Sequence, residues 1–225
     1  MKYYKALGKD GQPCNGGSGK YHLPTKKKDG SWKPGKWMPV IKGDLELCVN
    51  GYHLCRPQDL IKWLNEEIYE AEYKGQIIKG DDKIVVSRVR LLRRVETWNG
   101  RTAREFACWC VRNTPLENDK TTWDLLTDKS RDAVRVAEKY ARGEATDEEL
   151  AAARAAARGA ARAAAWAAAR GAAGAAVWTA ARAAARDAAG DVAWAAAGAA
   201  ARDAAWAAQT KHLLFEILQE TGVEE

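Results

Sequence analysis

The sequence has little that would place it in a membrane or outside the cell. No apolar run reaches the roughly 18 residues that a membrane helix needs, because Arg, Gly or Trp interrupts the alanine-rich part every fourth residue. The first residues, Met1–Lys5, contain no apolar core and no cleavage site, so we expect no signal peptide. We therefore expect a cytoplasmic protein with no membrane partner.

The sequence also lacks the compact signatures of common enzymes. It contains no Walker loop, no Gly-x-Ser-x-Gly turn, no His-Glu-x-x-His helix and no paired-carboxylate pattern. The cysteine count is odd, which in a chain without a signal peptide indicates reduced thiols. We expect no cofactor and favour a non-enzymatic role, while leaving catalysis open. The five cysteines are Cys14, Cys48, Cys55, Cys108 and Cys110.

Arginine is missing from the most basic part of the chain. The net charge is +6, and residues 1–44 alone carry ten Lys against three Asp. Residues 8–35 contain seven Gly and three Pro, so we expect a flexible loop there, with Lys26, Lys27 and Lys28 as its basic centre. Such a loop can attract phosphate, but lysine alone is poorly suited to reading bases, and a solvated loop is the favoured interpretation.

The remaining pattern predicts an α+β fold. We expect a small mixed sheet with packed helices over residues 1–145, followed by an alanine-rich multi-helix bundle over 146–225. Asn50-Gly51 is typical of a hairpin turn, and Thr146 with Glu149 forms a capping box. Strands are expected at 2–7, 37–41, 45–48, 52–55, 68–73 and 83–90, a turn at 75–82, and helices from Arg56-Pro57, from Asn99, and over 120–127 and 130–142.

The alanine-rich part has a strict period of four. Between Ala151 and Thr210, 36 of 60 residues are Ala, and every fourth residue from Arg154 to Trp206 is Arg, Trp or Gly. A period of four drifts around an α-helix by about 40° per repeat, so one straight rod would spread its Trp residues over several faces. We expect several short packed helices instead, near 147–170, 175–189 and 192–220.

Arg and Trp of this repeat are the candidate partner-binding residues. Arg can stack on Trp one turn away, which would give a ladder for nucleic acid or another acidic partner. The favoured alternative buries Trp between helices and leaves Arg in solvent. The candidates are Arg162, Trp166, Arg170, Trp178, Arg182, Arg186, Trp194, Arg202 and Trp206.

Cys48, His53 and Cys55 form the densest set of metal-ligand residue types. Cysteine and histidine bind zinc well, and His53 and Cys55 would share one face of a strand. A fourth ligand could come from Cys14, His22, Cys108 or Cys110. The spacing fits no standard zinc module, so buried thiols beside a hydrogen-bonded histidine are favoured over a metal site.

A looser pattern is similar to that of ADP-ribosyltransferases. Gly51–Cys55 follows a strand, Tyr4-Lys5 lies on the opening strand, and Glu66–Glu72 is acidic. That family uses a polar residue on its first strand, an aromatic residue or Ser on a later one, and a Glu. The similarity implies Tyr4, His53 and Glu70 as catalytic candidates. The first-strand Arg or His of the family is absent unless Lys5 replaces it.

The chain as a whole resembles a group of uncharacterised proteins of tailed phages and prophages. The resemblance is carried by Leu47–Cys55, by Gly80–Lys83 and by the repetitive alanine-rich part. That group combines an N-terminal domain with Leu-Cys-x-x-Gly-x-His-x-Cys and Asp-Asp-Ser-Lys motifs with a repetitive C-terminus. Here Lys83 follows Asp82 directly, without the Ser. The resemblance implies a mobile-element origin and a host-cell setting, and it implies no activity.

Together these observations favour a non-enzymatic phage or mobile-element protein for interaction or assembly. Its Ala/Trp/Arg helices would bind a host protein, a phage protein or a second copy, and occlusion of a host immune effector is one form of this. One alternative is a nucleotide-using enzyme with an ADP-ribosyltransferase-like N-terminal domain. Another is a nucleic-acid-binding protein that uses Lys26–Lys28 and the Arg residues of the repeat.

Overall fold

The structure, a computed structural model, describes residues 2–13, 17, 19–115, 120–168 and 202–219. The described chain forms two compact units. The first contains the residues up to Asn99 together with Leu218, and the second runs from Gly100 to Ile217. The expected boundary at residue 145 lies inside the second unit. A small sheet and several helices confirm the predicted α+β class.

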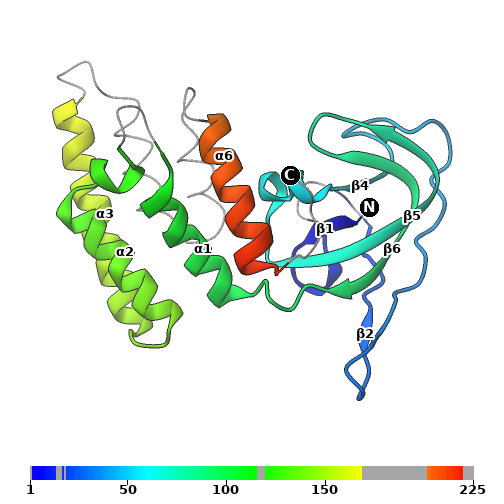
Figure 1. Ribbon diagram of the computed structural model, residues 1–225, viewed down its shortest axis with the longest axis horizontal. Coiled ribbons are helices and arrows are strands. Elements are labelled where there is room, and N and C mark those ends of the chain that lie inside the picture. The colour runs from blue at the N-terminus through cyan, green and yellow to red at the C-terminus, as the bar shows by residue number, and fades with distance from the viewer. Residues whose placement is uncertain (1, 14–16, 18, 116–119, 169–201, 220–225) are drawn as a thin grey trace. The chain divides into compact units, whose positions relative to one another are not determined.

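The first unit is built on a four-stranded antiparallel sheet with the order β1-β5-β6-β4 (Figure 1). The backbones of Tyr4 and Cys55 exchange hydrogen bonds of 2.9 and 2.8 Å, which join the two outer strands. The sheet therefore closes on itself as a small barrel. Its strands are β1 (Tyr3–Leu7), β4 (Tyr52–Leu54), β5 (Glu67–Lys79) and β6 (Ile84–Arg94).

Alternation along the strands fills the barrel. Successive side chains of a strand point to opposite faces, so every second residue reaches the interior. In β1 these are Tyr3, Lys5 and Leu7, and Tyr3 and Leu7 belong to the interior apolar cluster. The buried members of this cluster are Leu7, Tyr21, Met38, Leu54, Tyr69, Ala71, Ile84, Val86, Val89 and Leu91.

Two predicted strands before β4 are wrong. Gly35, Met38 and Ile41 donate backbone hydrogen bonds to carbonyls of β6, but their segment does not form a regular strand. Residues 45–50 make a turn with one bridge between Glu46 and Asn50. The expected hairpin across Asn50-Gly51 fails because β4 pairs with β6, a partner about thirty residues away in the chain, which local turn chemistry does not reveal.

The other expected strands and the first helix keep their places with changed bounds. The predicted turn at 75–82 is wrong, because β5 continues to Lys79 through a register irregularity between Lys74 and Ile77. The helix expected after Arg56 is a 3-10 helix, η2 (Pro57–Trp63), which packs against β1.

The expected loop over residues 8–35 contains ordered elements. These are a 3-10 turn, η1 (Lys9–Gly11), and a hairpin of β2 (Thr25–Lys26) and β3 (Trp32–Lys33) that extends away from the barrel (Figure 1). Tyr21 is buried in the barrel cluster, and its backbone N–H donates to the Gly11 carbonyl. One side of the segment is therefore anchored, and its flexibility stays a prediction.

The described part of the second unit is mainly helical. Its elements are α1 (Gly100–Asn113), η3 (Thr122–Leu125), α2 (Asp128–Ala141), α3 (Asp147–Ala168), α6 (Arg202–Lys211) and the π-helical turn η4 (His212–Ile217). The predicted helices from Asn99 and over 130–142 correspond to α1 and α2. The helix predicted over 120–127 is wrong, because only η3 forms there before Thr127 caps α2.

Short-range sequence features set the ends of α2 and α3 as expected. Gly143 adopts φ 78°, and its N–H donates to the Tyr140 carbonyl beyond the end of α2. Glu149 accepts from the Thr146 backbone at 2.8 Å, and Thr146 accepts from the Glu149 backbone at 3.2 Å. The predicted capping box is therefore confirmed.

Side chains from distant parts of the chain hold this unit together. Arg112 of α1 forms a two-hydrogen-bond ion pair with Glu138 of α2. The buried Gln209 side chain of α6 donates to the Thr114 hydroxyl at 2.6 Å. The His212 ring stacks on Trp109 with ring centres 3.9 Å apart, beside the buried Leu213 and Leu214.

The described helices include none that combines enough length with enough hydropathy to cross a membrane. The middle of the alanine-rich part, residues 169–201, lies outside the described residues. The helices expected near 175–189 and in the first part of 192–220 therefore stay predictions.

Candidate functional site

The candidate site is a cavity of about 450 Å³ in the first unit. It lies where β1, β4 and the turn before β4 meet the segment that carries Tyr21. Its polar and aromatic lining residues are Lys5, Tyr21, Cys48, Asn50, Tyr52, His53, Cys55, Trp63 and Lys83. No carboxylate belongs to the lining, so the charged side chains that reach this cavity from the described chain are both lysines.

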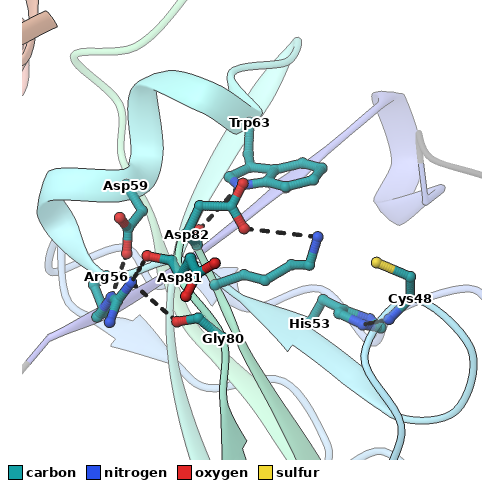
Figure 2. Close-up of polar contacts among 9 residues, drawn as sticks. Cys48, His53, Arg56, Asp59, Trp63, Gly80, Asp81 and Asp82 are labelled. Atoms are coloured by element: carbon teal, nitrogen blue, oxygen red, sulfur yellow. Dashed lines mark hydrogen bonds and ion pairs between the residues drawn. The ribbon is translucent and has the colours of Figure 1, made fainter. Parts of the chain in front are cut away.

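His53 fixes one wall of the cavity. Its Nε2 accepts a hydrogen bond from the backbone N–H of Cys48 at 2.8 Å (Figure 2). Burial lowers the pKa of His53, and the ammonium groups of Lys5 and Lys83 lower it further, while a hydrogen bond with the Gly51 backbone raises it. The ring is thus held neutral, with Nε2 as an acceptor, and it stabilises the turn in which Cys48 adopts φ 66°.

Lys5 places a charge where an apolar side chain would be expected. It lies on the interior side of β1 between Tyr3 and Leu7. Its Nζ donates to the His53 carbonyl at 3.0 Å and lies 5.1 Å from the centre of the Tyr21 ring. Desolvating an ammonium group is costly, so its position on the core side of a strand favours a role in binding.

Lys83 brings the second charge from the turn between β5 and β6. Its Nζ lies 4.3 Å from the centre of the Trp63 ring and 3.7 Å from the Asp82 carboxylate. The side chain is only 15% exposed. Trp63 thus orients Lys83 at the cavity by a cation–π contact, while Asp82 compensates part of its charge.

A clamp of side chains positions this turn (Figure 2). Arg56 pairs with Asp59 and donates to the carbonyls of Gly80 and Asp81. Trp63 Nε1 donates to the Asp82 carbonyl at 3.1 Å. Arg56 and Trp63 follow the motif at 47–55 and hydrogen-bond to backbone carbonyls of the motif at 80–83. These contacts hold the two motifs close together.

The structure separates His53 from the other two catalytic candidates. His53 lines the cavity, whereas Tyr4 and Glu70 do not belong to its lining. Tyr4 is fully buried, and Glu70 is its neighbour in the β1–β5 ladder.

The acidic stretch that suggested Glu70 has another role. Glu70 pairs with Arg93, and the neighbouring Glu67 and Glu72 pair with Arg94 and Arg90. All three are ion pairs between β5 and β6. The carboxylates of this stretch therefore neutralise the arginines of the adjacent strand.

The metal candidates Cys48 and Cys55 differ in environment. Cys48 is exposed and Cys55 is buried, and burial raises the pKa of the Cys55 thiol to about 12. Within the residues that the structure describes, no group of three or more His, Cys, Asp or Glu side chains is arranged to hold a metal ion. His53 Nε2 already accepts the Cys48 N–H, so the lone pair of Nε2 is not available to a metal ion.

The described residues of the basic loop and of the repeat are not among the residues that line this cavity. Lys26 pairs with Glu96 at 2.6 Å, and Lys27 and Lys28 are exposed. Trp206 lies partly exposed in α6, while Arg162, Trp166 and Arg202 are described only as backbone positions of α3 and α6. The other candidates lie outside the described residues: Arg170, Trp178, Arg182, Arg186 and Trp194.

Most of the cavity could not be predicted from the sequence. Tyr21, Tyr52, Trp63 and Lys83 were not expected in one site, since they come from four separate segments. One detectable signal was Lys5, a lysine on the apolar side of an alternating strand.

Comparison with known proteins adds no relative. The chain matches no protein-family model, no curated protein and no solved structure.

Proposed function

We propose that this chain is a binding protein whose N-terminal unit holds a small anionic ligand with an aromatic ring, of the mononucleotide class. The observation that carries the proposal is the convergence of Lys5 and Lys83 on one cavity that is lined by aromatic rings and by no carboxylate. Ammonium groups bind phosphate as point charges, and Tyr21, Tyr52 and Trp63 offer faces to a base.

The size of the cavity supports this ligand class. Small-molecule sites have volumes of about 300–1,000 Å³ and combine apolar walls with a few polar groups. The cavity volume of about 450 Å³ falls in that range. Asn50 adds an amide that can orient a ring through hydrogen bonds.

The side chains favour binding over chemistry. A general base must have a lone pair free to take a proton, and the Nε2 of His53 already accepts a backbone hydrogen bond. The Cys55 thiol, with its pKa raised to about 12, is a poor nucleophile at neutral pH. These features support binding without covalent catalysis.

Calorimetric titration of the full chain with AMP and ADP tests the proposal. We expect binding of both, weaker binding of uncharged adenosine, and a loss of about tenfold or more in Lys5→Met and Lys83→Met. Lys79→Met is the matched control, because Lys79 is exposed on β5 and does not line the cavity. Equal affinity for adenosine and ADP, or equal losses in all three variants, would contradict it.

The same protein sample tests the enzyme alternative. An ADP-ribosyltransferase or a related hydrolase would release nicotinamide from NAD⁺. Release that is lost in Glu70→Gln would support the enzyme, although Glu70 is paired with Arg93 outside the cavity lining.

The alanine-rich part carries a second proposed role, phage-type interaction or assembly through its Ala/Trp/Arg helices. This proposal depends on the repeat of the sequence and on the helices α3 and α6 at its two ends. Leu150 and Ala157 of α3 are buried, so removing all residues after 146 would damage the second unit. Sedimentation and host-lysate pull-down should therefore compare the full chain with Trp178→Ala/Trp194→Ala, which should lose partner or self-association.

A further inference from the structure

A second aromatic and cationic surface is made of residues that do not line the cavity. At its centre is Trp37, which is partly exposed in the segment beside β6. Three cations lie over its ring. Lys74 is 4.9 Å, Arg90 is 4.8 Å and Arg88 is 5.6 Å from the ring centre.

Two of these cations lie directly opposite each other on adjacent strands. Lys74 and Arg88 are direct partners in the β5–β6 ladder, so their side chains leave the sheet on the same side. Like charges in directly opposite positions destabilise an antiparallel pair. Charged ladder partners are expected to have opposite charges. Glu72 and Arg90, two residues further along the same two strands, are such a pair.

The charges of Lys74 and Arg88 have little compensation. Arg90 is neutralised by Glu72, whereas neither Lys74 nor Arg88 has a carboxylate partner within the described part of the chain. Among the described residues, the hydrogen bond that Arg88 donates goes to the Met38 carbonyl, at 3.2 Å. The fold therefore keeps Lys74 and Arg88 side by side despite their repulsion, and both side chains lie over the Trp37 ring.

We propose that this surface, made of Trp37, Lys74, Arg88 and Arg90, binds single-stranded nucleic acid. Phosphate groups would supply the negative charge that the ladder lacks at Lys74 and Arg88. The partly exposed Trp37 indole can act as a stacking platform, and a base can stack on it only when the base is unpaired. The excess of seven positive charges in residues 1–44 would steer a polyanion toward the unit that carries this surface.

Fluorescence anisotropy of the full chain with a labelled oligothymidylate of about 12 nucleotides tests this assignment. We expect binding at about 50 mM NaCl that weakens steeply by about 200 mM. Trp37→Leu should lose about tenfold in affinity, and Lys74→Gln should both weaken binding and reduce the salt dependence by about one phosphate contact. Lys79→Gln is the matched control on the same strand and should bind as the unchanged chain does.

Melting temperature separates a binding role from a structural one. Lys74→Gln should melt at the same temperature or higher, because it removes a repulsion with Arg88. Its affinity for AMP in the cavity should not change, which keeps this test independent of the proposed ligand site. The assignment is overturned if no single strand binds at low salt, if a duplex of equal length binds as tightly, or if Lys74→Gln and Lys79→Gln behave alike. It is also overturned if Lys26→Gln/Lys27→Gln/Lys28→Gln removes binding that Lys74→Gln leaves intact.

Discussion

The His53 ring and the Cys48 backbone are joined by a hydrogen bond of 2.8 Å, in which Nε2 accepts. This bond exists only while Nε2 carries no proton. It connects β4 to the turn that precedes it, and both line the same cavity. Protonation of His53 would therefore release a wall of the ligand site.

The first prediction concerns pH. Burial and two lysines lower the pKa of His53 below its ordinary value of 6.5, so the folded state takes up this proton less readily than the unfolded state. The stabilising effect of neutral His53 is complete above about pH 6.5 and is lost as the pH falls through the lowered folded pKa. Urea unfolding at decreasing pH should show a falling free energy of unfolding. His53→Gln should flatten that fall.

A second histidine requires its own control in that experiment. Burial also lowers the pKa of His212, which stacks on Trp109 in the helical unit. His212→Gln should therefore flatten the fall for the second unit and leave the pH dependence of AMP binding unchanged. If His53→Gln left the pH dependence of both stability and AMP binding intact, the role assigned to the ring would be wrong.

The second prediction concerns Gly51, which adopts φ 132° beside β6. A Cβ atom there would lie 2.3 Å from Val85 Cγ2. Gly51→Ala should lower the free energy of unfolding by about 2–4 kcal/mol, since both backbone strain and a steric clash oppose it. Gly43→Ala shares the positive φ of 79° but meets no neighbouring atom, so it should cost about 1 kcal/mol. Equal costs would show that the contact with Val85 is not rigid.

The third prediction concerns the clamp on the turn at 80–83. Arg56→Ala removes the donors to two backbone carbonyls and should cost about 2–3 kcal/mol of unfolding free energy in urea. Lys26→Ala breaks an exposed ion pair with Glu96 in the same unit and should cost less than about 1 kcal/mol. Arg56→Ala should also weaken ADP binding, because the same turn positions Lys83.

The fourth prediction concerns thiol reactivity. Cys48 is exposed, whereas burial raises the pKa of Cys55 and Cys108 to about 12 and raises that of Cys110. Iodoacetamide at neutral pH should modify Cys48 well before these three, as peptide mass spectrometry can measure. Saturating ADP should slow the reaction of Cys48, which lines the cavity, and adenosine should slow it less. Modification of Cys55 as fast as Cys48 would contradict the buried position of the Cys55 thiol.

The sequence predicted the features that depend on neighbouring residues. Thr146 and Glu149 cap α3 as expected, and Gly143 ends α2, because these contacts join residues within one turn. Alternation likewise located β6. Each of these structures is decided by the chemistry of a few adjacent side chains.

Long-range pairing was not predictable in the same way. Residues 45–55 were expected to form a hairpin, but β4 pairs with β6 instead. This pairing buries Leu54 beside Ile84 in the interior apolar cluster. The cavity combines Lys5, His53 and Lys83, which no local pattern connects. Lys74 and Arg88 likewise became a pair only through the register that the β5–β6 ladder has between its two irregularities.

The closing contact of the barrel has a consequence for protein synthesis. β1 ends at Leu7, yet its ladder needs Glu67–Ala71, and its bridge needs Cys55. At about 5–20 residues per second, the ribosome takes roughly 3–12 s to make the intervening chain. During that time β1 is an unpaired strand that contains two adjacent tyrosines, Tyr3 and Tyr4. Of the four strands of this sheet, β1 thus waits through the longest stretch of chain for its ladder partner, and during that time it is open to pairing with the wrong strand.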